Sequence, residues 1–332
     1  MKGKRLSVVV IGRNEGERLT RCLASLKAIN FPSEQLEVIY VDSCSSDNSV
    51  EIATQFGATV VKLEPGHLTA AKGRNAGWRI ASAAYILFLD GDTILDANFI
   101  DRAFKQMQDF NVAVLFGNRR EIRPKDSIYN RVLDLDWISP PGSAEFCGGD
   151  ALIRRSVLKT VGGYDETLIA GEEPDMCRRI RAKGFQILHI DSPMTGHDLA
   201  MKSLKQYLKR AFRTGYAYAK VSERFQATEL PLWQSESRRN FRHASVFSTI
   251  LFLSLTSSIF LHSFVPLIVF MGMFFALVVR TMLKFRWKTD SRITLLLYSI
   301  HSHLQQFPIL IGQIGYWWDR RSNQMRGLVE YK

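Results

Sequence analysis

The amino-acid sequence predicts an α/β fold, in which a mostly parallel sheet is flanked by helices and a helical membrane anchor follows. Two observations support this prediction. Over 6–191, short apolar runs alternate with segments whose apolar residues recur at helical spacing, and this alternation is typical of parallel strands joined by right-handed crossovers. Further along the chain, 246–279 contains no Asp, Glu, Lys or Arg, a composition that no soluble loop requires.

The expected strands are short apolar runs bounded by Gly or by polar residues. The run at 6–12, LSVVVIG, is apolar almost throughout, which indicates a strand buried on both faces. Similar runs predict strands at 36–42, 59–63, 85–90, 112–117 and 185–191. Ligands of such sheets bind at the carboxyl ends of the strands, so the polar residues that follow each strand are candidates for a site.

Helices are expected between these strands. Within 17–29, Leu19 and Leu26 belong to a set of apolar residues that recur on one helix face. Further segments of this kind predict helices at 47–56, 70–83, 151–166, 174–183 and 201–221. The third of these ends at Gly162-Gly163, and Gly is common just past a helix C-terminus.

Charge and cysteine content narrow the class of protein. The net charge of +12 indicates an anionic partner. Basic residues concentrate at 202–242 and 280–292, on both sides of the uncharged stretch, which favours an anionic membrane face over a nucleic-acid groove. No nucleic-acid-reading module is recognisable, so we expect no nucleic-acid partner. The 4 cysteines form no CxxC pair, which indicates a reducing, cytoplasmic setting.

The length of the uncharged stretch determines its expected topology. One crossing needs roughly 20 residues, and 246–279 is longer than that, with His262, Ser263 and Pro266 near its middle. We therefore expect a membrane hairpin at 246–283 with both ends on the cytoplasmic side, where the basic flanks would lie. The alternative is a buried helical hairpin in a soluble domain.

Two groups of polar residues follow the first two expected strands. Arg13, Asn14 and Glu15 come directly after 6–12. Asp42 ends the second strand, where a carboxylate can accept a hydrogen bond from a ribose hydroxyl or a pyrimidine N–H. Either group could instead serve as an ordinary turn or helix cap.

A third group precedes the fourth strand. Lys72, Arg74 and Asn75 lie where a loop is expected to enter a helix, and diphosphate oxygens are stabilised by such cations and by free helix N–H groups. The alternative is a solvated basic turn. Arg210 and Arg213 on the later basic helix could also reach a diphosphate, or they could face the membrane.

The fourth group is Asp90-Gly91-Asp92, which closes the apolar run YILFLD. Two carboxylates separated by Gly can hold one hard divalent cation against a diphosphate. A bare Asp-Gly-Asp is usually a turn, but its place at the end of a buried strand favours a metal site.

A later segment, GEEPD, offers a candidate general base. Pro174 suits the first turn of a helix, which would place Glu173 at the cap and Asp175 just inside. A carboxylate there could take a proton from an acceptor hydroxyl, and the helix N-terminus would favour its ionised form. The alternative is a plain capping carboxylate.

Together these motifs resemble the family 2 glycosyltransferases with the GT-A fold. VVVIGRNEGERL at 8–19, VDSCSSDNS at 41–49, GRNAG at 73–77 and Asp90-Gly91-Asp92 arrive in the family's order, and the resemblance covers about 6–220. It implies that Asp90 and Asp92 hold Mg²⁺ or Mn²⁺. It also implies that a late histidine, His197, completes the metal shell.

The resemblance extends to the acceptor side of the site. CGGDALIRRSVLKTVGGYDE at 147–166, which includes Gly149 and Asp150, is similar to the family's acceptor-side loop and helix. The segment 171–185 is similar to the one that carries the base. Many relatives have Glu-Asp where this chain has Glu172-Glu173, so the base is Glu173 or, one position earlier, Glu172.

The resemblance implies an inverting transfer of a sugar from a nucleotide diphospho-sugar, UDP-linked by preference, to a hydroxyl of a lipid-linked or polysaccharide acceptor. Synthase-type relatives carry Gln-x-x-Arg-Trp, and 206–210 is only a loose echo of it, so we do not expect processive synthesis. The alternatives are transfer to a polyprenyl phosphate, and a non-catalytic membrane scaffold with a degenerate transferase domain.

The expected organisation follows from these assignments. A catalytic domain would span 1–225, a basic linker 226–245 and the membrane hairpin 246–283. We expect 292–332 to be an amphipathic segment at the membrane interface, because the histidines, glutamines and Pro308 within 293–318 make it too polar for a crossing. Tyr316, Trp317 and Trp318 suit the headgroup level. The protein would then lie at the plasma membrane with its catalytic domain in the cytoplasm.

Overall fold

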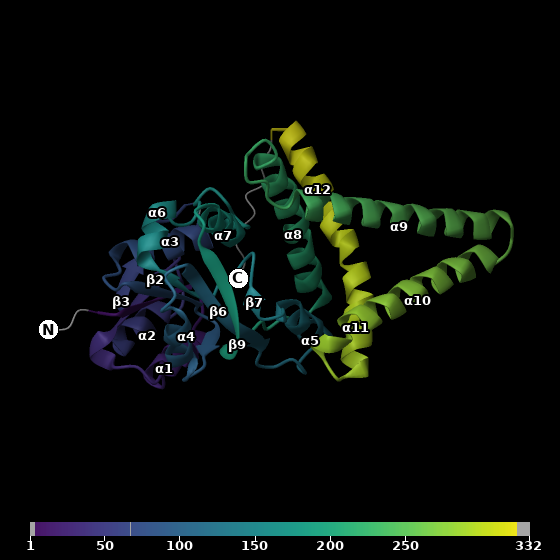
Figure 1. Cartoon of the computed structure of the whole chain (residues 1–332). Coiled ribbons are helices and arrows are strands. Elements are labelled where there is room, and N and C mark those ends of the chain that lie inside the picture. Colours follow the sequence, from purple (N-terminus) through teal and green to yellow (C-terminus); the bar gives the residue numbers. More distant parts are fainter. Residues whose placement is uncertain (1–3, 67, 324–332) are drawn as a thin grey trace. The chain divides into compact units, whose positions relative to one another are not determined.

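The structure, a computed structural model, describes residues 4–66 and 68–323 and divides into two compact units (Figure 1). The first unit comprises the described residues up to Ile122 together with Trp137–Leu199. The second comprises Arg123–Asp136 and the described residues from Ala200 onward. The sequence analysis placed the end of the catalytic domain at residue 225, whereas the first compact unit ends at Leu199, because the next helix packs within the second unit.

The first unit is built on a single mixed sheet. Its strand order is β3-β2-β1-β4-β8-β6-β9-β5, and β7 pairs with β9. The strands are β1 (Leu6–Gly12), β2 (Leu36–Asp42), β3 (Thr59–Lys62), β4 (Tyr85–Asp90), β5 (Thr93–Leu95), β6 (Val112–Glu121), β7 (Gly142–Ser143), β8 (Ala151–Arg154) and β9 (Gln186–His197). β1 to β4 run parallel, as expected, whereas β8 is antiparallel to both of its neighbours.

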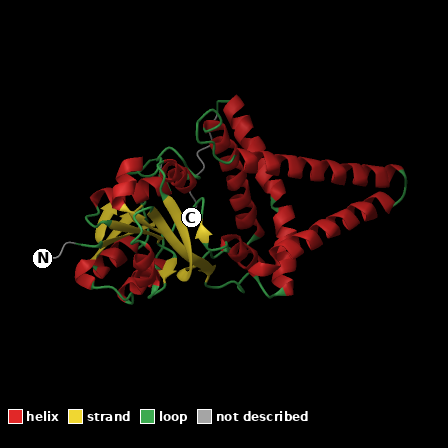
Figure 2. Cartoon of the chain, in the orientation of Figure 1, coloured by secondary structure: helices red, strands yellow, loops and turns green. Residues whose placement is uncertain are grey.

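Helices cover both faces of this sheet (Figure 2). They are α1 (Glu17–Lys27), α2 (Ser49–Phe56), α3 (Ala70–Ile80), α4 (Phe99–Gln106), α6 (Arg155–Val161) and α7 (Glu172–Ala182), with a 3-10 turn, η1, at Ser33–Gln35. Side chains of β1 alternate between two cores: Val8 and Val10 pack with α1, α2 and α4, whereas Val9 packs with α3, α6 and α7. This period-two alternation explains why the strand is apolar at almost every position.

The segment 151–166 differs from the expectation of one helix. Ala151–Arg154 forms β8, and the helix α6 begins only at Arg155. Leu152 packs into one core, and Ile153 into the other. A helix could not deliver adjacent side chains to opposite faces of a sheet, so burial on both faces overrides the helical pattern.

The second unit is helical throughout its described residues, apart from turns. Its helices are α5 (Ile128–Asp134), α8 (Leu204–Arg224), α9 (Gln234–Phe260), α10 (Val265–Phe285), α11 (Arg292–Leu304) and α12 (Gln306–Arg321), with 3-10 turns η2 (Leu135–Trp137), shared with the first unit, and η3 (Arg286–Lys288). α8 and α12 approach closely: a Cβ on Gly215 would collide with the Ile309 carbonyl, and one on Gly312 with the Phe212 carbonyl. Glycines at both points therefore permit this packing.

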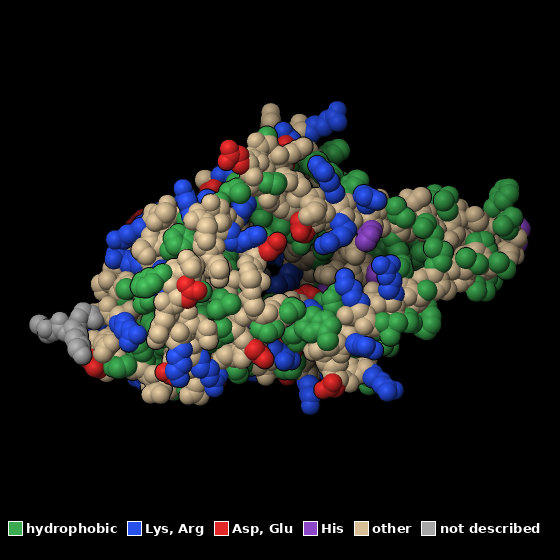
Figure 3. All heavy atoms as spheres, viewed as in Figure 1, with side chains coloured by type: hydrophobic (Ala, Val, Ile, Leu, Met, Phe, Trp, Pro, Cys, Tyr) green, Lys and Arg blue, Asp and Glu red, His purple; other side chains and the backbone are tan. Residues whose placement is uncertain are grey.

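α9 and α10 form a hairpin with an apolar surface. Both are long and apolar enough to cross a membrane by length and composition: an 18-residue window within Gln234–Phe260 has a mean hydropathy of 1.5, and one within Val265–Lys288 has 2.1. Large apolar side chains are exposed along it, including Phe252 at 65% and Phe260 at 85%, and Figure 3 shows apolar side chains covering this part of the chain.

The expected interfacial segment 292–332 is only partly described, because 324–332 lie outside the described residues. In the described part, α11 and α12 each bury a face in the second unit. Gln313 is fully buried, donating to Ser237 Oγ at 2.9 Å and accepting from Asn240 Nδ2 at 3.0 Å. Gln313, one of the polar residues in this segment, thus serves as a hydrogen-bonding group inside the second unit, and the interfacial location of the segment stays a prediction.

Candidate active site

The carboxyl ends of β1, β2 and β4 lie side by side. The parallel register pairs Gly12 with Asp42 and Ile11 with Asp90. The polar groups that follow these strands therefore gather at one edge of the sheet, as the sequence pattern predicted.

The loop after β1 is bonded to the loop after β2. Asn14 N–H donates to Ser45 Oγ at 2.9 Å, and Asn14 Oδ1 accepts from Ser46 N–H at 2.7 Å. Glu15 N–H donates to Ser49 Oγ at 3.1 Å. The two loops therefore form one continuous polar surface.

Asp42 is buried and oriented by its neighbours. Oδ1 accepts from the Tyr40 hydroxyl at 3.1 Å, and Oδ2 accepts from Ser45 N–H at 2.9 Å. Burial, together with the charge of Asp42, raises the pKa of Tyr40 well above its ordinary value, so the hydroxyl stays protonated and donates. Each carboxylate oxygen keeps a second lone pair for a ligand.

Arg74 connects two parts of the site. Its guanidinium donates to Asp90 Oδ1 at 2.9 Å and to Glu172 Oε1 at 3.0 Å. Burial opposes its charge, but the carboxylates of Asp90 and Glu172 raise its pKa above the ordinary value, so the group stays cationic. Arg74 thereby joins the end of β4 to the start of α7.

Arg119, on β6, is a second buried cation that the sequence analysis did not select. Its Nε donates to Asp150 Oδ2 at 3.1 Å, and Nη2 lies 3.5 Å from Asp90 Oδ2. Asp150 also accepts from Asp90 N–H at 3.1 Å and from Thr195 Oγ1 at 2.8 Å. The rule that strand ends collect ligands would have found Arg119, because it follows the apolar run 112–117.

Asp90, Asp92 and His197 form a group that could hold a metal ion. One ligand atom from each lies within 4.8 Å of the others. His197 Nε2 is 3.4 Å from Asp92 Oδ1, and His197 Nδ1 is buried without a partner among the described residues. Burial lowers the pKa of His197, which favours the neutral imidazole that ligates metals. These residues fit a divalent cation with oxygen and imidazole ligands.

Two arginine N–H groups of the residues selected from the sequence, one of them on the Arg74 that binds Asp90, also lack partners among the described residues. Arg13 Nε and Arg74 Nε are buried, and no described residue accepts from either. An unsatisfied buried donor costs free energy unless a ligand or water satisfies it. Both groups suit an anionic ligand such as a diphosphate.

α7 begins two residues earlier than the sequence analysis expected. Glu172 is its first residue and Gly171, with φ of 84°, is the N-cap. Glu173 is therefore in the first turn rather than at the cap, and Pro174 is the third helical residue. Gly171 adopts the left-handed conformation that favours glycine, which sets the start of the helix there.

The two candidate bases have different surroundings. Glu172 is bonded to Arg74, and burial raises its pKa. Glu173 Oε1 accepts from Cys147 N–H at 2.8 Å and also contacts two thiols. Among the described residues nothing pairs with Glu173 Oε2. Glu173 is thus anchored through one oxygen, with the other available for a proton.

Gly149 leaves room for the ion pairs around Asp90. A Cβ at this position would lie 2.8 Å from Arg74 Nη2 and 2.9 Å from Asp90 Oδ2. Any other residue would displace the Arg74–Asp90 pair, so Gly149 shapes the site through its lack of a side chain.

Asn75 was expected to bind substrate, and the structure gives it a different role. Its Nδ2 donates to the Tyr164 carbonyl and to Glu166 Oε1, both at 2.8 Å. Its Oδ1 accepts from Trp78 Nε1 at 2.8 Å and from Tyr164 N–H at 3.0 Å. All four of its hydrogen-bonding positions are used, so Asn75 holds α3 against the segment after α6.

Lys72, Arg210 and Arg213 were also expected to bind the diphosphate. Lys72 is half-buried in the first turn of α3. Arg210 and Arg213 belong to α8 of the second unit. Their role in binding the donor stays a prediction.

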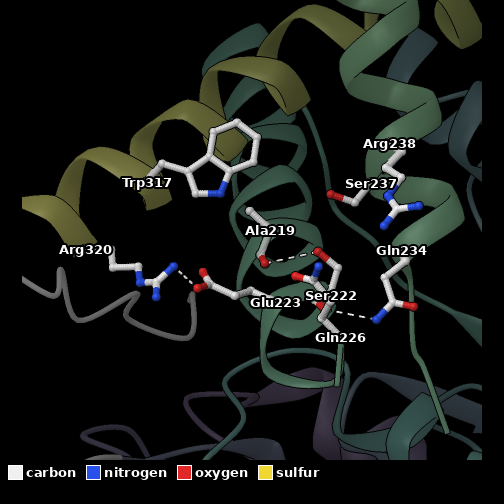
Figure 4. A pocket seen from close by; sticks show the side chains of 9 residues that line it. All are labelled: Ala219, Ser222, Glu223, Gln226, Gln234, Ser237, Arg238, Trp317 and Arg320. Atoms are coloured by element: carbon white, nitrogen blue, oxygen red, sulfur yellow. Dashed lines mark hydrogen bonds and ion pairs between the residues drawn. The ribbon is translucent and has the colours of Figure 1, made fainter. Parts of the chain in front are cut away.

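The second unit has a polar pocket of its own, with a volume of about 300 Å³ (Figure 4). In it, Gln234 Nε2 donates to the Ser222 carbonyl at 3.1 Å, and Arg320 pairs with Glu223. Glu223 Oε2 is buried without a partner among the described residues. The pocket is lined by Ala219, Ser222, Glu223, Gln226, Gln234, Ser237, Arg238, Trp317 and Arg320.

At the carboxyl edge of the sheet, buried arginine side chains lie with an Asp-Gly-Asp turn and a late histidine. This arrangement is typical of a GT-A transferase. Sequence comparison agrees: "Glycosyl transferase family 2" matches residues 7–162, and "Glycosyl transferase family group 2" matches 85–283. The chain belongs to the family 2 glycosyltransferases.

Curated relatives include glycosyltransferase AglE of Haloferax volcanii, 25% identical over 228 residues, which are 65% of this chain and 73% of AglE. Poly-beta-1,6-N-acetyl-D-glucosamine synthase of Staphylococcus epidermidis is 29% identical over 183 residues, 49% of this chain and 43% of the synthase. The match thus spans less than half of the synthase.

Solved structures show the same fold. Mannosyltransferase PcManGT from Pyrobaculum calidifontis, in complex with GDP-Man and Mn2+, has a TM-score of 0.69 at 16% identity, covering 95% of this chain and 88% of that one. S. aureus TarS 1-349 in complex with UDP-GlcNAc has a TM-score of 0.54 at 16% identity, covering 97% and 93%. At such identities the likeness establishes the fold alone.

Proposed function

We propose that this glycosyltransferase is metal-dependent and inverting, and that it moves a sugar from a nucleotide diphospho-sugar, UDP-linked by preference, to a hydroxyl of a lipid-linked or saccharide acceptor. The observation that supports this most is that Arg74 forms ion pairs with both Asp90 and Glu172. It thereby connects the group that could hold a metal ion to the start of α7, which carries the candidate bases. The complexes of TarS with UDP-GlcNAc and of PcManGT with GDP-Man and Mn2+ support a nucleotide-sugar donor.

The donor would lie along the edge formed by the loops after β1 and β2. Asp42 accepts from the ribose or base, and Asn14 and Glu15 keep this loop in place. The buried N–H groups of Arg13 and Arg74 donate to diphosphate oxygens, which satisfies them. Asp90, Asp92 and His197 would hold Mg²⁺ or Mn²⁺, which, when bound, neutralises charge on the leaving diphosphate.

Glu173 would act as the general base. Its Oε2 takes the proton of the acceptor hydroxyl while that oxygen attacks the anomeric carbon and the bond to the diphosphate breaks on the opposite face. The bond from Cys147 N–H to Oε1 fixes the position of the carboxylate. Glu172 is the competing candidate, although its bond to Arg74 already engages one of its oxygens.

The α9–α10 hairpin supports a membrane location. Many large apolar side chains of the hairpin are exposed, Phe252 and Phe260 among them, and a large exposed apolar surface is typical of a membrane or protein contact. We therefore assign the hairpin to the plasma membrane, with the first unit in the cytoplasm. A membrane location favours a lipid-linked acceptor.

Transfer to a polyprenyl phosphate is the second candidate, favoured by the same apolar hairpin. That acceptor is already an anion and needs no base. A panel of nucleotide sugars, assayed with the purified full chain, Mn²⁺ and either a lipid-linked saccharide or a polyprenyl phosphate, separates the two. Product with the saccharide supports the main proposal, and product with the polyprenyl phosphate alone contradicts it.

A further inference from the structure

Two cysteines and the candidate base form a compact buried group. Cys147 Sγ lies 3.5 Å from Cys177 Sγ, and Glu173 Oε1 lies 3.4 Å from the first sulfur and 3.2 Å from the second. All three side chains are buried, and they come from the loop before β8 and from one face of α7. Burial raises the pKa of Cys177, so without a metal its thiol is protonated and donates to Glu173.

The spacing of these three atoms matches the edges of a tetrahedral zinc site. With Zn–S of about 2.3 Å and Zn–O of about 2.0 Å, the sulfurs of such a site are about 3.8 Å apart, and sulfur and oxygen are about 3.5 Å apart. The observed separations of 3.5, 3.4 and 3.2 Å are within a few tenths of an ångström of these edges. Small shifts would therefore admit the ion.

We propose that Cys147, Cys177 and Glu173 bind a thiophilic divalent cation, Zn²⁺, and that this ion inhibits the enzyme by coordinating the general base. The inhibitory part of this inference rests on the proposed role of Glu173. The binding part depends only on the ligand set.

Coordination can proceed without loss of the existing anchor. Glu173 Oε1 has two lone pairs, so it can keep the bond from Cys147 N–H while it ligates the ion. The ion replaces two thiol protons, which pass to solvent, and forms two Zn–S bonds and one Zn–O bond. A water completes the tetrahedron.

This site differs chemically from the group of Asp90, Asp92 and His197. Two thiolates prefer zinc and other soft ions, whereas a carboxylate-rich set suits Mn²⁺ and Mg²⁺. Because Zn²⁺ also binds oxygen and nitrogen ligands more tightly than Mn²⁺ does, the test keeps Mn²⁺ saturating and assigns to the thiol site only the binding and inhibition that depend on Cys177.

The test begins with binding. Reduced, purified full chain, saturated with Mn²⁺, is titrated with Co²⁺ as a spectroscopic substitute for Zn²⁺. We expect a sulfur-to-cobalt charge-transfer band that Zn²⁺ abolishes, that Cys177→Ser lacks and that Cys44→Ser keeps. Cys44 is the matched control, because it is a free cysteine of the first unit outside the group. The absence of a band that depends on Cys177 would overturn the proposal, whether or not the enzyme is active.

Inhibition is then measured against each variant's own zinc-free rate. We expect the zinc concentration for half-inhibition to rise in Cys177→Ser by at least the roughly tenfold that loss of an outer-shell partner costs, and to be unchanged in Cys44→Ser. If the cobalt band is present but zinc does not inhibit the enzyme, the metal site is supported, and inhibition through coordination of Glu173 is refuted. Equal inhibition of both variants would refute it as well.

Discussion

The two units of this chain distribute polar and apolar residues in opposite ways. In the first unit, Phe88 and Leu89 are fully buried and charged groups gather at the sheet edge. In the second unit, Phe252 and Phe260 are exposed, whereas Gln313 and Ser299 are fully buried. The first pattern is that of a domain that folds in water. The second is the distribution that the proposed membrane location of the hairpin would require. The comparison teaches that apolar burial defines the core of the first unit, whereas polar residues also belong to the core of the second.

If the sheet edge of the first unit carries the chemistry, its carboxylates should show the largest effects. Asp92→Asn should abolish transfer and weaken UDP binding in the presence of Mn²⁺, because it removes one charged ligand of the proposed metal. Turnover and UDP affinity are the measurements. Asp101→Asn, an exposed carboxylate paired with Lys105, is the control and should behave like the wild type. Normal turnover of Asp92→Asn would exclude the metal assignment.

The next largest effect should separate the two glutamates of α7. Glu173→Gln should lower kcat by roughly 10²-fold while leaving donor binding nearly intact, because a general base contributes about that factor. Glu172→Gln is the matched variant, one residue away. If Glu172→Gln shows the kcat loss with unchanged donor affinity, the base is Glu172. If neither variant does, the acceptor is an anion and needs no base.

Substitutions at the packed glycines of the second unit should lower its stability rather than the rate of catalysis. Gly312→Leu should destabilise the bundle by about 3 kcal/mol, because its side chain would collide with the backbone of α8. Thermal unfolding in detergent measures this. Gly272→Leu is the control, since a Cβ at that position meets nothing within 4 Å. Equal unfolding temperatures for both variants would contradict the close packing of α8 and α12.

The smallest effect on activity should come from cysteines placed around the hairpin. Ser263→Cys should be labelled in intact cells by a membrane-impermeant reagent, and Thr289→Cys should react only after permeabilisation, because basic residues hold that end in the cytoplasm. Both variants should keep their activity. The reverse labelling pattern would refute the hairpin topology, and protection of both would indicate a re-entrant hairpin.

Local patterns were sufficient to predict the parallel half of the sheet. LSVVVIG and YILFLD are almost entirely apolar because both faces are covered, and the polar residues at their carboxyl ends do meet at one edge. β8 was missed because Ala151–Arg154 is short and runs directly into a helix. Its strand identity comes from antiparallel pairing with β4 and β6, which local sequence does not encode.

Site residues that directly follow a strand could be predicted from the sequence. Site residues that are brought together by contacts between distant parts of the chain were harder to predict. Asp42 and Asp90 follow from the strand rule. Arg119 would have followed from it too, had the rule been applied to β6. The pairing of Cys147 with Cys177 depends on how α7 packs against the loop before β8, so spacing along the chain could not reveal it.

The central claim is that the Asp90, Asp92 and His197 group makes sugar transfer depend on a divalent metal. The most direct test is the rate of sugar transfer by the purified full chain in excess chelator, before and after Mn²⁺ or Mg²⁺ is restored. We expect transfer to fall to background in chelator and to recover when either ion is added. Full turnover in excess chelator would contradict the claim.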